Sequence, residues 1–196
     1  MTPVWYAAYG SNTLASRFDC YLRGGRPAGG ARTYPGCRDT APPRASTALR
    51  VPGRLVFGGT STVWGGGMAF LDDVAPGTAP ARAWLVTAGQ FADVAAQEMH
   101  AEPGTVALDA VPVGRHHLGP GRYETVVRLG DRDGVPVLTL TCPEPPPPAP
   151  PSAAYLRVLA AGLVEAGWPA AAVVDHLAVA STWARADVAA LLVPAP

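Results

Sequence analysis

The spacing of apolar residues along the chain predicts short strands mixed with helices. Apolar runs bounded by glycine, proline or asparagine indicate strands at residues 4–9, 55–60, 63–71, 81–88, 123–129 and 135–141. Apolar positions that recur every three or four residues indicate helices at 13–22 and 91–100, and two more between 152 and 184. The chain therefore belongs to the α+β class. We expect a small mixed sheet, flanked by helices, that curls or closes into a barrel to protect its edge strands.

The segments between these elements are of two kinds. Residues 23–54 are rich in glycine, proline and arginine, which indicates loops. The run PEPPPPAPP at 143–151 predicts an extended polyproline connector that joins neither a sheet nor a helix interior. The turn at 131–134 closes a hairpin, and Ser152 is expected to cap the helix after the connector. We expect a single domain over residues 1–196, with the connector inside it.

The composition argues against several classes of partner. Hydrophobic residues make up 48% of the 196 residues and charged ones 15%, which is typical of a globular domain. All fifteen basic residues are arginines, and they equal the acidic ones in number, so the zero net charge gives no reason to expect nucleic acid. The three cysteines form no CxxC pair, and neither a membrane-length apolar run nor a signal peptide is recognisable. We therefore expect a cytoplasmic protein that does not bind membranes.

The turn Gly10-Ser11-Asn12 is the first candidate site. It joins the strand at 4–9 to a helix, so consecutive backbone N–H groups point out of a positive helix end and can bind a carboxylate or a developing oxyanion. Glycine permits a close approach, and Ser11 or Asn12 can cap the helix. Taken alone, these residues favour a simpler interpretation, an ordinary strand-to-helix turn with an N-cap.

Glu98 is the second candidate. It follows Phe91 by seven residues and so lies on the same apolar face of the helix at 91–100. A carboxylate on an apolar face is either shielded by a partner or kept for proton transfer. The alternative is a solvent-facing carboxylate near the helix end, paired with an arginine. Glu102 is the nearest competitor, but we expect it to lie beyond the helix.

Four segments, in order along the chain, resemble the gamma-glutamylcyclotransferase family. WYAAYGSN at 5–12 is similar to the family's YGSN loop, which ends its first strand, and VWGGGMA at 63–69 is similar to its tryptophan- and glycine-rich strand. AWLVTAGQFADVAAQE at 83–98 resembles the strand–helix segment that ends in the family's catalytic glutamate. PPSAAYLRVLAAGLVEAGWP at 150–169 resembles the opening of its C-terminal helix.

The resemblance implies a reaction and the residues that carry it. A gamma-glutamyl amide would cyclise by attack of its own α-amine on the γ-carbonyl, in lyase or acyltransferase chemistry that gives 5-oxoproline and an amine or amino acid. Glu98 would be the general base and acid, and Tyr155 would line the site. The substrate loop would bind chiefly through backbone groups of Tyr6, Ala7, Ala8, Tyr9, Gly10, Ser11 and Asn12. No metal or cofactor is required, the partner is the small gamma-glutamyl substrate, and a homodimer is left open.

The chain departs from the family's pattern at three places. Thr13 follows the asparagine where the family usually has leucine, Met99 follows the glutamate in place of glycine, and residues 139–142 lack an aromatic residue. These differences concern the side of the site that receives the departing amine, so the sequence leaves the substrate open. Two rival hypotheses stay open as well. One is a non-catalytic module that binds a small amino-acid-like ligand on the same fold, and the other is intermolecular amide hydrolysis or acyl transfer at the same site.

Other catalytic chemistries find less support in the sequence. His116 and His117 are adjacent and point in different directions, and the other two histidines have no partner at ligand spacing. This pattern argues against a zinc amidohydrolase or deacetylase. Ser11 lies outside a GxSxG motif, and a lone loop cysteine such as Cys37 is more often incidental than reactive.

Overall fold

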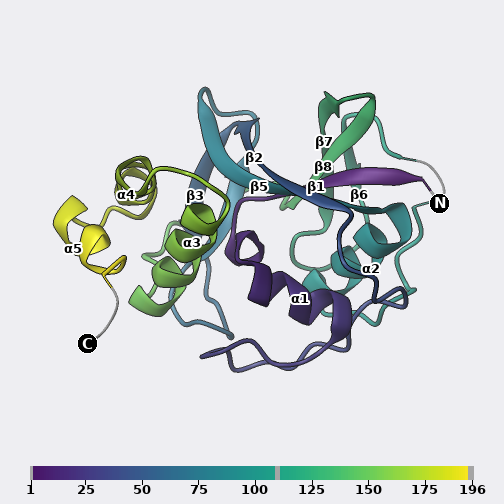
Figure 1. The fold of residues 1–196 in the computed structure, drawn as a ribbon, viewed down its shortest axis with the longest axis horizontal. Coiled ribbons are helices and arrows are strands. Elements are labelled where there is room, and N and C mark those ends of the chain that lie inside the picture. Colours follow the sequence, from purple (N-terminus) through teal and green to yellow (C-terminus); the bar gives the residue numbers. More distant parts are fainter. Residues whose placement is uncertain (1, 109–110, 194–196) are drawn as a thin grey trace.

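A computed structural model describes residues 2–108 and 111–193 of the chain (Figure 1). Its main feature is a curled, mixed six-stranded sheet in the order β2-β5-β1-β8-β7-β6, beside a two-stranded sheet, β3-β4. The strands are β1 (Pro3–Ala8), β2 (Ala45–Pro52), β3 (Arg54–Gly58), β4 (Met68–Asp72), β5 (Thr78–Thr87), β6 (Arg115–His117), β7 (Thr125–Arg132) and β8 (Val135–Thr141). The helices are the 3₁₀ turn η1 (Ser11–Thr13), α1 (Ala15–Arg23), α2 (Ala88–Glu98), α3 (Ala153–Glu165), α4 (Ala170–Ser181) and α5 (Arg185–Ala190).

β1 is a central strand, and it is buried on both faces. It pairs antiparallel with β5 and parallel with β8. Its side chains alternate between two hydrophobic cores, as the period of a strand requires. The even-numbered residues belong to the core of α1 and α2, and the odd-numbered ones belong to the core of β3, α3 and α4. The expected strand at 4–9 is therefore confirmed to within one residue at each end.

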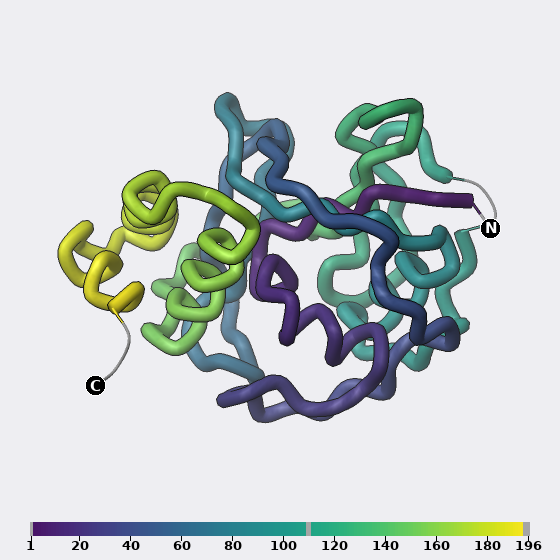
Figure 2. The backbone as a smooth tube through the Cα atoms, viewed as in Figure 1, coloured from purple at the N-terminus to yellow at the C-terminus, as the bar shows by residue number. Residues whose placement is uncertain are grey.

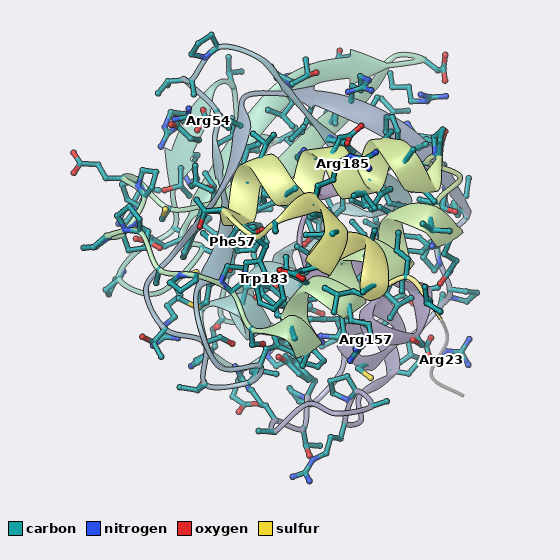
Figure 3. All side chains as sticks on the ribbon, turned by 90° about the vertical axis from the view of Figure 1, so that its left-hand side faces the viewer. Arg23, Arg54, Phe57, Arg157, Trp183 and Arg185 are labelled. Carbon is teal, nitrogen blue, oxygen red and sulfur yellow. The ribbon has the colours of Figure 1, made fainter. Side chains whose placement is uncertain are left out.

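The helices lie in two groups around the sheet. In Figure 1, α1 and α2 lie below it, and α3, α4 and α5 are grouped at its left. Figure 3 looks at that left-hand end, where Phe57 of β3 and Trp183, between α4 and α5, belong to the same core. Among the described residues, no helix has both the length and the apolar character needed to cross a bilayer.

The main sheet is open. β2 and β6 stand at opposite ends of the strand order, and no pairing joins them within the two described ranges. The expectation of a closed barrel is therefore not confirmed, whereas the curled sheet and its flanking helices are. The curl brings the end of β1 toward the α3 side of the molecule, where the next turn begins (Figure 1).

The expectation that residues 23–54 form only loops is wrong for their second half. β2 occupies 45–52 and pairs antiparallel with β5 along its whole length, from Ala45↔Leu85 to Pro52↔Thr78. Its arginine and its proline resemble loop composition, but β2 is an edge strand, where proline is tolerated. The first half of the segment does form a loop, which runs along the lower edge of the molecule in Figure 2.

The polyproline connector at 143–151 is extended, as expected, but it does contact strand backbone. The N–H of Ala149 donates to the carbonyl of Phe57 at 3.1 Å, and the carbonyl of Pro150 accepts from the N–H of Gly67 at 2.8 Å. Proline lacks a donor but keeps its acceptor, so a proline-rich segment can still pair along one side. A Cβ on Gly67 would lie within 3.0 Å of Ala149, which explains the glycine there.

Hydrogen bonds cap the starts of two helices, and the sequence places only the start of α3 correctly. The helix expected at 91–100 is α2, which begins three residues earlier, at Ala88, and ends at Glu98. Thr87 and Gln90 form a capping box where β5 passes into α2. The hydroxyl of Ser152 accepts from the N–H of Tyr155 at 3.1 Å, as expected for the cap of α3. The predicted strand at 63–71 is shorter than expected, because only 68–72 pairs with β3.

Gly162 of α3 lies where this helix meets η1. A Cβ at this position would lie within 3.0 Å of both Thr13 and Leu14, so α3 can approach the turn only without a side chain. Gly89 of α2 differs, because a Cβ there would have its nearest neighbour, the Thr87 hydroxyl, at 3.8 Å. Gly162 and Gly89 are both helical, so Gly89 serves as a matched control for a substitution at Gly162.

We expect Gly162→Ala to lower the free energy of unfolding by about 1–3 kcal/mol, because overpacking forces backbone to shift. Gly89→Ala should be neutral or stabilising by up to about 1 kcal/mol, since alanine favours a helix more than glycine does. Urea unfolding of both variants measures the difference. Equal stability of the two would contradict the close approach of α3 to η1.

His176 of α4 predicts an acid-sensitive contribution to stability. Burial, with Arg50 nearby, lowers the pKa of this imidazole from 6.5 to about 4. Between those two values the unfolded chain binds more protons, so stability falls as the pH drops from 6.5 toward 4, by up to about 1.4 kcal/mol per pH unit. Urea unfolding at pH 7, 5.5 and 4.5 should show a flatter decline in His176→Gln than in the wild type. Equal declines in the two proteins would contradict the assignment of this acid sensitivity to His176.

Candidate functional site

A pocket lies where the β1–η1 turn, the end of α2 and the loop before β4 meet. It holds about 700 Å³ of empty space, part of which is continuous with solvent. All six tyrosines of the chain line it, and within residues 2–108 and 111–193 Glu98 is the one acidic residue of the lining. The described residues that line it are Tyr6, Tyr9, Gly10, Ser11, Asn12, Arg17, Tyr21, Arg32, Tyr34, Ser61, Thr62, Val63, Trp64, Met68, Ala69, Glu98, His100, Arg122, Tyr123, Leu140 and Tyr155.

Glu98 is the last residue of α2, and Asn12 holds its carboxylate. The Nδ2 of Asn12 donates to Glu98 Oε1 at 2.9 Å and lies 3.2 Å from the hydroxyl of Tyr6. Asn12 is only 3% exposed, and its backbone carbonyl accepts from the indole Nε1 of Trp84 at 2.9 Å. The turn after β1 and the end of α2 are thereby joined through side chains.

The environment of Glu98 favours a carboxyl group that can exchange a proton. Burial raises its pKa above the ordinary value, and the Arg17 guanidinium opposes part of that rise, as do hydrogen bonds from Tyr21 and Asn12. A general base and acid works best when its pKa lies near the working pH, so a raised pKa suits this role.

Arg17 is a buried cation that sequence reasoning missed. It is 3% exposed, and its Nη2 donates to the hydroxyls of Tyr21 at 3.2 Å and Tyr34 at 2.7 Å. The guanidinium carbon also lies 4.5 Å and 4.3 Å from the centroids of these two rings. The available signal was its spacing, because Arg17 and Tyr21 lie one turn apart on the buried face of α1.

Tyr155 forms another part of the pocket wall. Its oxygen accepts from the N–H of Ala69 at 3.4 Å, which leaves the phenolic proton for a ligand, since it donates to no acceptor within residues 2–108 and 111–193. Its ring stacks on Trp64 with centroids 6.2 Å apart. Gly10 lies opposite, where an added Cβ would be 3.4 Å from the Tyr155 hydroxyl.

The structure brings most of the predicted site residues together. Glu98 and Tyr155 line the pocket, and so do five residues of the expected substrate loop, Tyr6, Tyr9, Gly10, Ser11 and Asn12. Ala7 and Ala8 are not among the lining residues; they pack into the two hydrophobic cores on either face of β1. Glu102 follows the end of α2 and lies outside the lining.

The histidines are placed differently from one another. His116 and His117 are exposed on the short edge strand β6. His100 lines the pocket, directly beyond α2, with a left-handed φ of 64°. Within the described part of the chain, no three His, Cys, Asp or Glu side chains are grouped so that they could hold a metal ion.

No family model matches the chain, and comparison of sequences finds a relative that it matches in part. The chain is 34% identical, over 187 residues, to the Arabidopsis thaliana protein named histone deacetylase 5. The similarity covers 84% of this chain but spans only 28% of the length of that protein. The name of the longer protein therefore says little about the segment that is matched.

Comparison of structures defines the fold. A gamma-glutamyl cyclotransferase structure superimposes with a TM-score of 0.52 and 18% identity, covering 85% of this chain and 82% of its own. An uncharacterized protein from Homo sapiens gives a TM-score of 0.53 and 20% identity, covering 86% and 83%. The chain thus has a gamma-glutamyl cyclotransferase-like fold. Identities this low show the fold and leave the reaction to the site.

We expect the Glu98 carboxyl to titrate above 4.5, because burial disfavours its charged form. Asn12→Ala should raise the midpoint further, since it removes a donor to the carboxylate, and Arg17→Gln should do so by removing a positive charge. Carbon-detected NMR of labelled glutamate measures these midpoints, and Glu98→Gln assigns the resonance. A midpoint that falls in Asn12→Ala would contradict the hydrogen bond.

Proposed function

We propose that this protein is a gamma-glutamylcyclotransferase-like enzyme, which converts a gamma-glutamyl amide into 5-oxoproline and a free amine or amino acid. The observation that carries this proposal is the Glu98 carboxylate, held by Asn12 in a pocket of tyrosines with its pKa raised by burial. The fold likeness to a gamma-glutamyl cyclotransferase supports the same reaction class.

Glu98 would act twice in one catalytic cycle. The α-amine of the substrate attacks the γ-carbonyl carbon, a C–N bond forms, and Glu98 accepts the proton that the amine loses. The tetrahedral intermediate carries an oxyanion. Glu98 then returns the proton to the departing nitrogen as the original amide C–N bond breaks. The carboxylate is restored, and no other proton donor, metal or cofactor takes part.

The turn after β1 would bind the substrate's oxygen atoms. The first hydrogen bond of η1 runs from the N–H of Thr13 to the carbonyl of Gly10 at 3.1 Å, so the N–H groups of Ser11 and Asn12 have no partner inside the helix. Together with the Tyr155 hydroxyl they can stabilise the oxyanion and hold the flexible glutamyl chain in a cyclised pose. Orientation of this kind lowers the entropic part of the barrier.

The first test is a product assay with three proteins. The wild type, Glu98→Gln and the matched control Glu102→Gln are incubated with a panel of gamma-glutamyl amides, and 5-oxoproline is measured by mass spectrometry. Loss of a general base and acid should reduce turnover about 100- to 10,000-fold in Glu98→Gln. Glu102→Gln should retain wild-type turnover, because Glu102 lies outside the pocket.

The same assay separates the rival hypotheses. Release of glutamate in place of 5-oxoproline would indicate intermolecular hydrolysis at this site. A gamma-glutamyl ligand that raises the melting temperature of wild type and Glu98→Gln alike, with no product from either, would indicate a binding module and refute the enzyme proposal.

A further inference from the structure

The pocket carries more positive charge than its proposed chemistry uses. Among the described residues, three arginines line it, Arg17, Arg32 and Arg122, against the single carboxylate of Glu98. None of the three forms an ion pair with a described residue, although eight other arginines do. Unpaired guanidinium groups that line a pocket attract an anionic ligand, so the distribution points to a second negative group on the substrate.

The three arginines differ in depth. Arg17 is buried, and its Nη2 already donates to two tyrosine hydroxyls. Arg32 is half-buried, and Arg122 is exposed. A ligand that enters from solvent would therefore meet Arg32 and Arg122 before it reaches Arg17. We call these two residues the arginine pair.

Contacts with neighbouring loops hold Arg32 at the pocket. It lies in the loop between α1 and β2, and its guanidinium carbon is 5.0 Å from the ring centroid of Tyr34. The N–H of the preceding residue, Ala31, donates to the carbonyl of Val63 at 3.4 Å, which ties this loop to the one before β4. The charge of Arg32 also acts on Glu98, whose pKa it lowers.

Arg122 lines the pocket from the loop between β6 and β7. Its Nη1 makes weak contacts, 3.5 Å to the carbonyl of Thr60, which is long for an N–H···O bond, and 3.5 Å to the sulfur of Met68. The next residue, Tyr123, adopts a left-handed φ of 54° and donates its hydroxyl to the carbonyl of Ala69 at 2.8 Å. Non-glycine strain of this kind persists where the surroundings enforce it, often at ligand sites.

His100, another residue of the pocket lining, lies within electrostatic reach of both members of the arginine pair. Burial lowers the pKa of this imidazole, and the charges of both Arg32 and Arg122 lower it further. Both guanidinium groups therefore act on one side chain of the pocket lining. The backbone of His100 has a left-handed φ of 64°. His100 and Tyr123 are thus two strained residues of the same pocket lining.

We propose that Arg32 and Arg122 bind an anionic group on the part of the substrate that leaves as the amine. This inference rests on the proposed function, because the glutamyl carbonyl must lie beside Glu98 and the departing amine then extends toward solvent. The group is a carboxylate, phosphonate or phosphate, any of which accepts paired hydrogen bonds from guanidinium. The same charges disfavour amines that carry a second cation.

Four probes with one gamma-glutamyl group test the proposal: gamma-glutamyl-alanine, its C-terminal carboxamide, gamma-glutamyl-aminoethylphosphonate and gamma-glutamyl-putrescine. Dissociation constants are measured by calorimetry in the Glu98→Gln background, where turnover is suppressed, and 5-oxoproline release is measured separately with the Glu98 protein. The variants are Arg32→Gln, Arg122→Gln and both together. The control is Arg157→Gln, an exposed arginine of α3 outside the pocket lining (Figure 3).

We expect the acid to bind at least about tenfold more tightly than its carboxamide, and gamma-glutamyl-putrescine to bind most weakly. Each single variant should reduce the acid-to-amide preference about three- to tenfold, the double variant should abolish it, and Arg157→Gln should keep it. In the Glu98 protein, loss of the pair should raise KM with little change in kcat, because the contact exists before and during the reaction. Comparison of the alanine and phosphonate probes shows which anion is preferred.

The outcomes for the pair and for the reaction are distinct. Equal binding of acid and carboxamide, or a preference that survives in the double variant, overturns the arginine pair even when 5-oxoproline forms. A pair-dependent preference for the acid without 5-oxoproline from any probe keeps the pair and overturns the proposed reaction. Absence of binding by all four probes overturns both.

Discussion

The hydrogen bond from Asn12 Nδ2 to Glu98 Oε1 joins the two halves of the site, and much of the fold keeps its two ends in place. A carboxylate leaves water at a cost that hydrogen bonds and nearby cations must offset. Asn12 can supply such a bond because its backbone carbonyl accepts from Trp84 and because α3 packs closely on the same turn at Gly162. β1, β5, α2 and α3 therefore all help to fix the positions of Asn12 and Glu98. A shift in any of these elements would change the position of the donor and, with it, the energy of the half-buried Glu98 carboxylate.

The charges of the pocket depend on each other in the same way. Arg17 is buried without an ion-pair partner among the described residues, and Glu98 is close enough for each charge to stabilise the other. Removing one member would leave the other buried and less compensated, which costs more than the pair contributes. The tyrosines moderate this cost, because their hydroxyls accept from the guanidinium and their ring faces attract it. Tyr21 and Tyr34 thus allow the Arg17 guanidinium and the Glu98 carboxylate to lie near one another without forming an ion pair.

Features with a strong local period could be predicted from the sequence, whereas those that depend on distant contacts could not. β1 follows from a buried apolar run, and Glu98 follows from its helix face and from the family resemblance. β2 was missed although Leu49 and Val51 are two residues apart on one face, because arginine and proline around them resemble a loop. Arg17 was missed although Tyr21 follows it by one helical turn, since a helical arginine is normally expected in water and only tertiary packing buries it. Arg32 lies in a loop without a period, so its place at the pocket depends entirely on the fold.

The Tyr155 side of the pocket shows how backbone contacts can fix one part of a site while side chains define another. Tyr155 reaches the pocket because α3 begins directly after the polyproline connector, and backbone hydrogen bonds to Phe57 and Gly67 hold that connector. Such bonds require only a carbonyl or an N–H. They demand glycine where two backbones come close, as at Gly67, and place little restriction on the type of most neighbouring side chains. Arg32 and Arg122 lie in loops outside these backbone contacts, and their side chains line the same pocket. Under the proposed function, the fold fixes the part that receives the glutamyl group, and individual loop side chains choose the amine that leaves.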